Sequence, residues 1–159
     1  MARRLPVRKR PAHLPPVESG HRSVILFLTV CTHGRRPILA TSAVHEGLRA
    51  AWVEADHYLV GRYMIMPDHI HLFCAPAAWP PPLLKPWARY WKSRFASKWP
   101  RPFEGKLWQR DFWDRQLRRG ESYEAKWQYV VRNPVRAGLV EHPDDWPFQG
   151  ELNRLPWHD

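Results

Sequence analysis

Two histidines separated by one residue form the first pattern with chemical potential. His69 and His71 flank Ile70 in the run HIHLFCA, directly after Pro67 and Asp68. If this run forms a strand, its period of two residues places both imidazoles on one face and Ile70 on the other. Two imidazoles on one face can hold one metal ion, although structural histidines are the commoner origin of such a pair. The pair therefore predicts either a divalent-metal site or two structural side chains.

A polar stripe on the last predicted helix forms the second pattern. Successive helical residues are rotated by about 100°, which divides this helix into an apolar and a polar side. The polar side consists of Ser122, Lys126, Tyr129 and Asn133. The Tyr129 phenol, with an ordinary pKa of about 10, becomes a nucleophile only where a metal, a base or a cation favours the phenolate. The alternative is a surface tyrosine followed by an asparagine that ends the helix.

The Asn133 amide oxygen lies one turn beyond Tyr129 and could complete a metal site. Two imidazoles and one oxygen leave coordination positions open for phosphate and water. Such a donor set suits Mg²⁺ or Mn²⁺, and the histidines alone would equally suit Zn²⁺. We therefore expect an open divalent-metal site if His69, His71 and Asn133 converge.

Hydrophobic patterning predicts the elements that must position these groups. In chain order they are a strand at 23–32, a helix capped by Thr41 or Ser42 and ending near 56, strands at 58–66 and 69–75, a helix from about 84, a strand within 106–117, and a helix from about 123 to 133. The Pro67-Asp68 reversal makes the second and third strands antiparallel, and Pro134 is expected to end the last helix. This order predicts an antiparallel α+β domain with helices packed on the sheet.

The chain has 159 residues, the size of one ordinary domain. We expect an irregular basic arm at 1–22, the folded domain at 23–150 and a short tail at 151–159. The aromatic residues Trp87, Trp91 and Phe95 repeat at helical spacing, which favours a core role over base stacking.

The charge balance favours a polyanionic partner. Lys and Arg number 25 against 15 Asp and Glu, giving a formal charge of +10. Solubility or a membrane surface would explain the same charge. Lys126 shares the polar stripe with Tyr129, where it could hold a phosphate or stabilise a phenolate. Further expected DNA contacts, with a solvated tail as the alternative, are Arg3, Arg4, Arg8, Lys9 and Arg10.

Cysteine use and hydropathy predict a reducing cytoplasm. Cys31 and Cys74 lie inside apolar runs without the spacing of a disulfide framework. The apolar run 24–31 is too short to span a bilayer, so no membrane association is expected.

Three blocks of sequence together resemble a known family. They are MPDHIHL from Met66, LWQRDFWD from Leu107 and YVVRNPVRAGLV from Tyr129. In order and spacing they resemble the single-tyrosine HUH-type transposases, and most closely the REP-associated tyrosine transposases. The resemblance covers roughly residues 23–148.

This resemblance implies a ferredoxin-like antiparallel sheet with the histidine pair on a central strand and the tyrosine helix packed over it. It implies that His69, His71 and Asn133 bind the metal and that Tyr129 is the nucleophile. The implied reaction cuts single-stranded DNA at a hairpin of the repetitive extragenic palindrome type and leaves a 5′-phosphotyrosine and a free 3′-hydroxyl. REP-associated relatives imply a monomer, and insertion-sequence relatives imply a homodimer with exchanged helices.

Two other functions fit the same residues. A hairpin DNA-binding protein, acting as a repressor or architectural factor, would keep the scaffold without cutting. A metal-dependent phosphoesterase would use the histidines to activate water and leave Tyr129 with a structural role.

Overall fold

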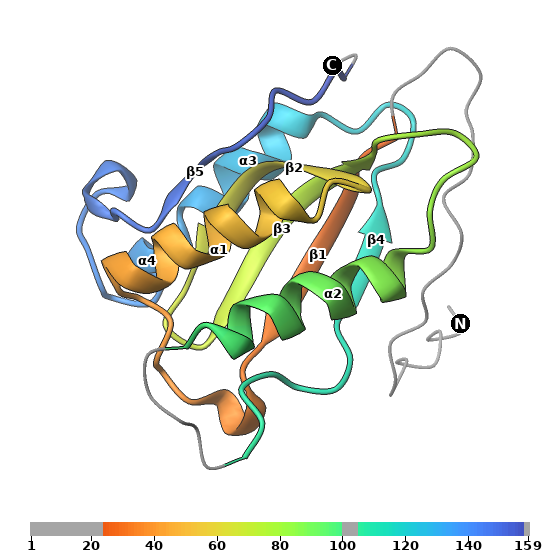
Figure 1. Cartoon of the computed structure of the whole chain (residues 1–159). Helices are drawn as coiled ribbons and strands as arrows, with labels where there is room; N and C mark the ends of the chain where they lie inside the picture. Colours follow the sequence, from red (N-terminus) through yellow and green to blue (C-terminus); the bar gives the residue numbers. More distant parts are fainter. Residues whose placement is uncertain (1–23, 100–104, 158–159) are drawn as a thin grey trace, which may run out of the picture.

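The computed structural model describes residues 24–99 and 105–157. In this part of the chain, five strands form one sheet in the order β4-β1-β3-β2-β5, and neighbouring strands are antiparallel (Figure 1). The strands are β1 (Leu26–Cys31), β2 (Tyr58–Ile65), β3 (His69–Pro76), β4 (Trp113–Gln116) and β5 (Gln149–Glu151). The predicted ferredoxin-like α+β fold is confirmed, and the strand that carries both histidines is central.

Helices cover both faces of the sheet (Figure 1). On one face lie α1 (Ser42–Glu54) and α2 (Leu84–Ser97), and on the other α3 (Tyr123–Val131) and the short α4 (Asn133–Arg136); the 3-10 turns are η1 (His33–Arg35) and η2 (Pro143–Asp145). The Thr41 hydroxyl caps α1 by accepting from the Val44 N–H at 3.2 Å, as predicted. Within the described residues, no helix combines the length and the apolar character needed to cross a bilayer.

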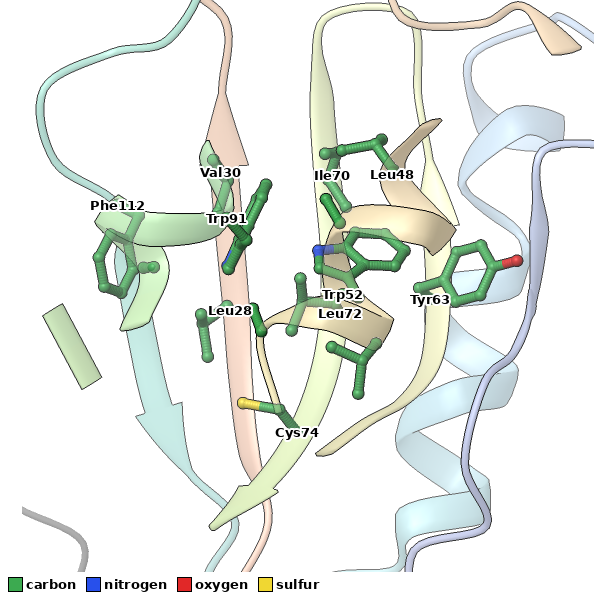
Figure 2. Packing of buried hydrophobic residues seen from close by; sticks show 14 of the residues in the cluster. Leu28, Val30, Leu48, Trp52, Tyr63, Ile70, Leu72, Cys74, Trp91 and Phe112 are labelled. Carbon is green, nitrogen blue, oxygen red and sulfur yellow. The ribbon is translucent and has the colours of Figure 1, made fainter. Parts of the chain in front are cut away.

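The alternation along β3 decides which side chains face which helices. Ile70 and Leu72 are fully buried in the core under α1 and α2, where they lie near Trp52 and Trp91 (Figure 2). Trp87, Trp91 and Phe95 are buried in the same core, which confirms the core role predicted for these aromatic residues. Because successive strand residues point to opposite faces, His69 and His71 must lie on the side of α3.

The other face holds a second core beneath α3. The ring of Phe73 on β3 packs edge-on against Tyr123, with 4.9 Å between ring centroids, and against Trp127 at 6.5 Å. Val130 and Val131 are buried in this cluster together with Met64 from β2. The tyrosine helix is thus anchored over β2 and β3, next to the histidines along β3.

The strand predicted within 106–117 is present and occupies the last part of that range. Only Trp113–Gln116 forms β4, and an isolated bridge joins Thr32 to Trp108. Leu107, Trp108 and Phe112 are all buried in the core under α2. Because these three apolar side chains share one core, the backbone between them cannot keep the strict alternation of a strand.

The helix expected to run to Asn133 and stop at Pro134 is in fact two helices. α3 ends at Val131, and Asn133 opens α4, in which Pro134 occupies the first turn. Proline is tolerated there because the first N–H groups of a helix have no partner within it. β5, which pairs with β2, was not predicted, because Gln149–Glu151 is short and polar.

We expect Gly61→Ala to destabilise the domain by about 1–3 kcal/mol, because an added methyl overpacks a filled site. A Cβ at Gly61 on β2 would lie 2.6 Å from Leu155 Cδ1 and 2.7 Å from the Tyr123 hydroxyl. Urea unfolding measures the change. In a Leu155→Ala background the same substitution should cost less, because one clashing side chain is gone. A Gly61→Ala chain within about 0.5 kcal/mol of wild type would contradict this packing.

Candidate active site

His69 and His71 lie side by side on the α3 side of β3. Both side chains are half-buried, and their ring centroids are 4.7 Å apart with planes inclined at 78°. Neither is sealed in the core. Two partly exposed imidazoles this close together on one face can contact one small ligand.

A carboxylate orients His69. Its Nδ1 lies 2.7 Å from Asp68 Oδ1, and Asp68 Oδ2 accepts from Arg35 Nε at 2.9 Å. Burial disfavours ionisation of Asp68, but the hydrogen bonds from His69 and Arg35 outweigh it and lower the pKa of this carboxyl. An ionised Asp68 accepts the proton of Nδ1 and leaves the Nε2 lone pair of His69 for a ligand. Asp68 thus orients His69 in addition to its place in the reversal before β3.

A hydroxyl orients His71. Its Nδ1 lies 2.9 Å from Thr29 Oγ1 on β1, and its ring stacks on Phe27 at 5.3 Å with 20° between planes. Burial lowers the pKa of His71 to about 3, and the nearby charge of Arg136 acts in the same direction. The imidazole is therefore neutral near pH 7. With Nδ1 bonded to Thr29, Nε2 is the atom available to a ligand.

Arg136 joins two candidate groups, Tyr129 on α3 and Asn133 at the start of α4. Tyr129 is 69% exposed on α3, so its hydroxyl is open to a macromolecule. The guanidinium carbon of Arg136 lies 4.3 Å from the centre of the Tyr129 ring, and its Nη2 donates to the Tyr129 carbonyl at 2.9 Å. The same Nη2 donates to Asn133 Oδ1. Arg136 lies within YVVRNPVRAGLV, but sequence alone gave no reason to single it out.

The structure places all four predicted groups on one face of the sheet. His69 and His71 lie on β3, Tyr129 and Asn133 belong to the helices over that face, and the charge of Arg136 acts on His71. Within residues 24–99 and 105–157, no group of three or more His, Cys, Asp or Glu side chains could hold a metal. A metal bound by the histidine pair would thus need a different donor, and the Asn133 amide is of a suitable kind.

Lys126 is near Tyr129 but already has a partner. Its Nζ lies 2.9 Å from Glu121 Oε2, which Arg115 Nη2 on β4 also approaches at 2.5 Å. Burial opposes ionisation of Glu121, but the Arg118 backbone N–H and the two cations outweigh it and lower the pKa of Glu121 to about 2. An open hollow beside α3 is lined by Glu121, Ser122, Ala125, Lys126 and Tyr129.

The other predicted DNA contacts cannot be placed in this site. They fall outside the described residues and are Arg3, Arg4, Arg8, Lys9 and Arg10. The remaining members of the site that sequence reasoning missed are Thr29 and Arg35. Their roles depend on contacts with residues more than 30 positions away in the chain.

Comparison with known proteins identifies related sequences and a related structure. A REP-associated tyrosine transposase of Escherichia coli is 26% identical over 135 residues, which cover 77% of this chain and 73% of the relative. A Haemophilus influenzae protein, provisionally given the same name, is 28% identical over 138 residues, which cover 78% of this chain and 77% of the relative. No protein-family model matches the sequence.

A solved structure of a REP-associated tyrosine transposase bound to a REP hairpin has the same fold. It superposes with a TM-score of 0.70 at 23% identity and covers 90% of this chain and 81% of that one. The predicted resemblance is confirmed: the chain is a homologue of proteins named REP-associated tyrosine transposases and shares the fold of that solved structure.

Proposed function

We propose that the chain is a metal-dependent endonuclease and strand transferase of single-stranded DNA that acts through a 5′-phosphotyrosine at Tyr129. One observation carries the proposal. His69 and His71 each have Nδ1 engaged by a protein oxygen, on the face of the sheet that the Tyr129 helix crosses. Outer hydrogen bonds of this kind fix the orientation of metal-binding histidines. The helix over that face also carries an exposed tyrosine, Tyr129.

The proposed substrate is a DNA hairpin with a single-stranded segment at its foot. A structural neighbour of this chain is bound to a REP hairpin, and two relatives carry the REP-associated name. The formal charge of +10 suits a phosphate backbone. Arg132 and Arg136 are exposed beside Tyr129 and supply local positive charge.

The residues present fit a divalent cation. His69 and His71 would offer Nε2 atoms, and Asn133 would offer its amide oxygen, which now accepts from Arg136. An amide oxygen has two lone pairs, so Arg136 must share or release it. Mg²⁺ or Mn²⁺ bound there would polarise the scissile phosphate.

The chain's own groups would then carry the transfer. The Tyr129 hydroxyl gives its proton to water and its oxygen bonds to phosphorus while the bond from phosphorus to the 3′ oxygen breaks. The 3′ oxygen takes a proton from water, which leaves a free 3′-hydroxyl and a 5′-phosphotyrosine. Arg136 places positive charge over the ring that bears this hydroxyl, and this charge would stabilise the negative charge that gathers on the phosphate oxygens during transfer. Attack by another 3′-hydroxyl reverses the step and joins strands. Because α3 packs on the chain's own sheet, we propose that Tyr129 acts with the histidines of its own subunit.

Trapping the covalent product tests the proposal. The chain is incubated with end-labelled stem-loop oligonucleotides in Mg²⁺ or Mn²⁺, and mass spectrometry identifies the modified peptide. An oligonucleotide attached to Tyr129 is expected. Hairpin binding without cleavage in either metal would instead indicate a DNA-binding protein without catalysis.

Thr29→Val is expected to weaken the affinity for Mn²⁺ by about 10- to 100-fold, because it removes the oxygen that holds His71 Nδ1 while keeping the side-chain shape. Isothermal titration calorimetry measures the change. Thr29→Ser keeps the hydroxyl and should bind Mn²⁺ like the wild type. Equal affinity in Thr29→Val and wild type would contradict an orienting role for Thr29.

A further inference from the structure

The face of the sheet that carries the histidines is covered unevenly. α3 packs over β2 and β3, where Phe73 and Met64 belong to its core. On β4, at the other side of the same face, Trp113 is 44% exposed. By contrast, the tryptophans at positions 52, 87, 91, 108 and 146 are all buried. An exposed indole on this part of the sheet therefore calls for a function.

Strand register places Trp113 in the same cross-strand row as His71, one of the two candidate metal ligands. Trp113 pairs with Thr29 on β1, and Thr29 pairs with His71 on β3. Directly paired residues of an antiparallel sheet project to the same face. Neighbouring strands are about 4.8 Å apart, so the Trp113 backbone lies about 10 Å across the sheet from that of His71. Phe27, which stacks on His71, is half-buried in the adjacent row.

Positive charge accompanies this aromatic surface. Arg115 lies two residues along β4 from Trp113 and projects to the same face, and Lys126 projects from α3 toward it, so that both contact Glu121. Exposed aromatic rings flanked by cations are the arrangement that binds unpaired nucleotides, since bases stack on the rings and cations hold the backbone. A tryptophan that only completed the edge strand would not require Arg115 and Lys126 close to it.

We propose that Trp113 is a stacking platform for an unpaired DNA base next to the scissile phosphate. The inference rests on the proposed function and adds a subsite to it: Trp113 takes the base, and Arg115 with Lys126 takes the adjoining phosphate. Stacking tolerates any base, because every base has a π face. The platform thus positions the strand and leaves sequence choice to other contacts.

A double-mutant cycle tests the platform. The wild-type chain first selects a stem-loop from a library that is randomised in its single-stranded segment, and fluorescence anisotropy then measures affinity at one fixed salt concentration. Trp113→Leu, which keeps an apolar side chain but removes the ring, should weaken binding about 5- to 150-fold. Trp113→Phe should retain most of the affinity. Trp79→Leu is the matched control, since Trp79 is 47% exposed in the loop beyond the far end of β3.

Abasic substitutions scanned along the single-stranded segment locate the stacked base. At one position, removing the base should weaken wild-type binding and leave Trp113→Leu binding unchanged. Equal affinity of Trp113→Leu and wild type, or equal abasic losses in both at every position, would overturn the platform alone. If the molecular mass measured by sedimentation differs between Trp113→Leu and wild type, Trp113 lies in a contact between copies of the chain, and the stacking platform is overturned. A wild-type chain that selects no stem-loop would overturn the proposed function itself.

Discussion

Tyr129→Phe should abolish the covalent protein–DNA adduct and lower cleavage by at least about 1,000-fold, because loss of a nucleophile removes the reaction path of a covalent enzyme. The change deletes only a hydroxyl from a side chain that is 69% exposed, so folding and hairpin affinity should stay close to wild type. Denaturing gels of end-labelled stem-loops measure adduct and cleavage, and anisotropy measures affinity.

Tyr90→Phe is the matched control for this change. Tyr90 is 51% exposed on α2, which covers the opposite face of the sheet, and its loss of a hydroxyl should leave cleavage unaltered. Cleavage that survives in Tyr129→Phe would contradict the transesterase and favour a hydrolase that uses the metal to activate water.

His69→Ala and His71→Ala should each reduce cleavage by more than about 100-fold, a larger loss than changes to the outer partners of metal ligands usually produce. Affinity for the hairpin should change little, because phosphate contacts supply most of the binding energy. Single-turnover cleavage across a Mn²⁺ titration measures the effect.

His57→Ala is the control for the two histidine variants, since His57 is exposed in the turn before β2. Thermal unfolding separates catalysis from structure. If His69→Ala and His71→Ala both lose thermal stability in parallel with cleavage, the two histidines are structural and the proposed metal site is wrong.

The β3 region was predictable because its sequence is locally unambiguous. Pro67-Asp68 supplies the reversal, and the strict alternation of His69, Ile70 and His71 fixes which side chains share a face. The buried aromatic residues of α2 were equally predictable, since one amphipathic stripe accounts for them. These features need no knowledge of distant residues.

The parts that were missed depend on tertiary contacts. β5 exists because β2 offers it an edge, and its own residues have little strand preference. The break between α3 and α4 at Arg132 could not be told from a helix that simply ends at Pro134. Thr29, which contacts His71, and Arg35, which contacts Asp68, became evident only from strand register and the turn around η1.

The ionised carboxylate of Glu121 places a fixed negative charge on the surface beside Tyr129. Its carboxylate holds Arg115 and Lys126 together in the absence of DNA. A phosphate that binds these cations must replace a carboxylate rather than only mobile salt ions, so association there is an anion exchange. The affinity for DNA should therefore fall less steeply with salt concentration than the number of basic side chains suggests. A strand that cannot place a phosphate against Arg115 and Lys126 leaves their ion pairs with Glu121 intact and binds less well.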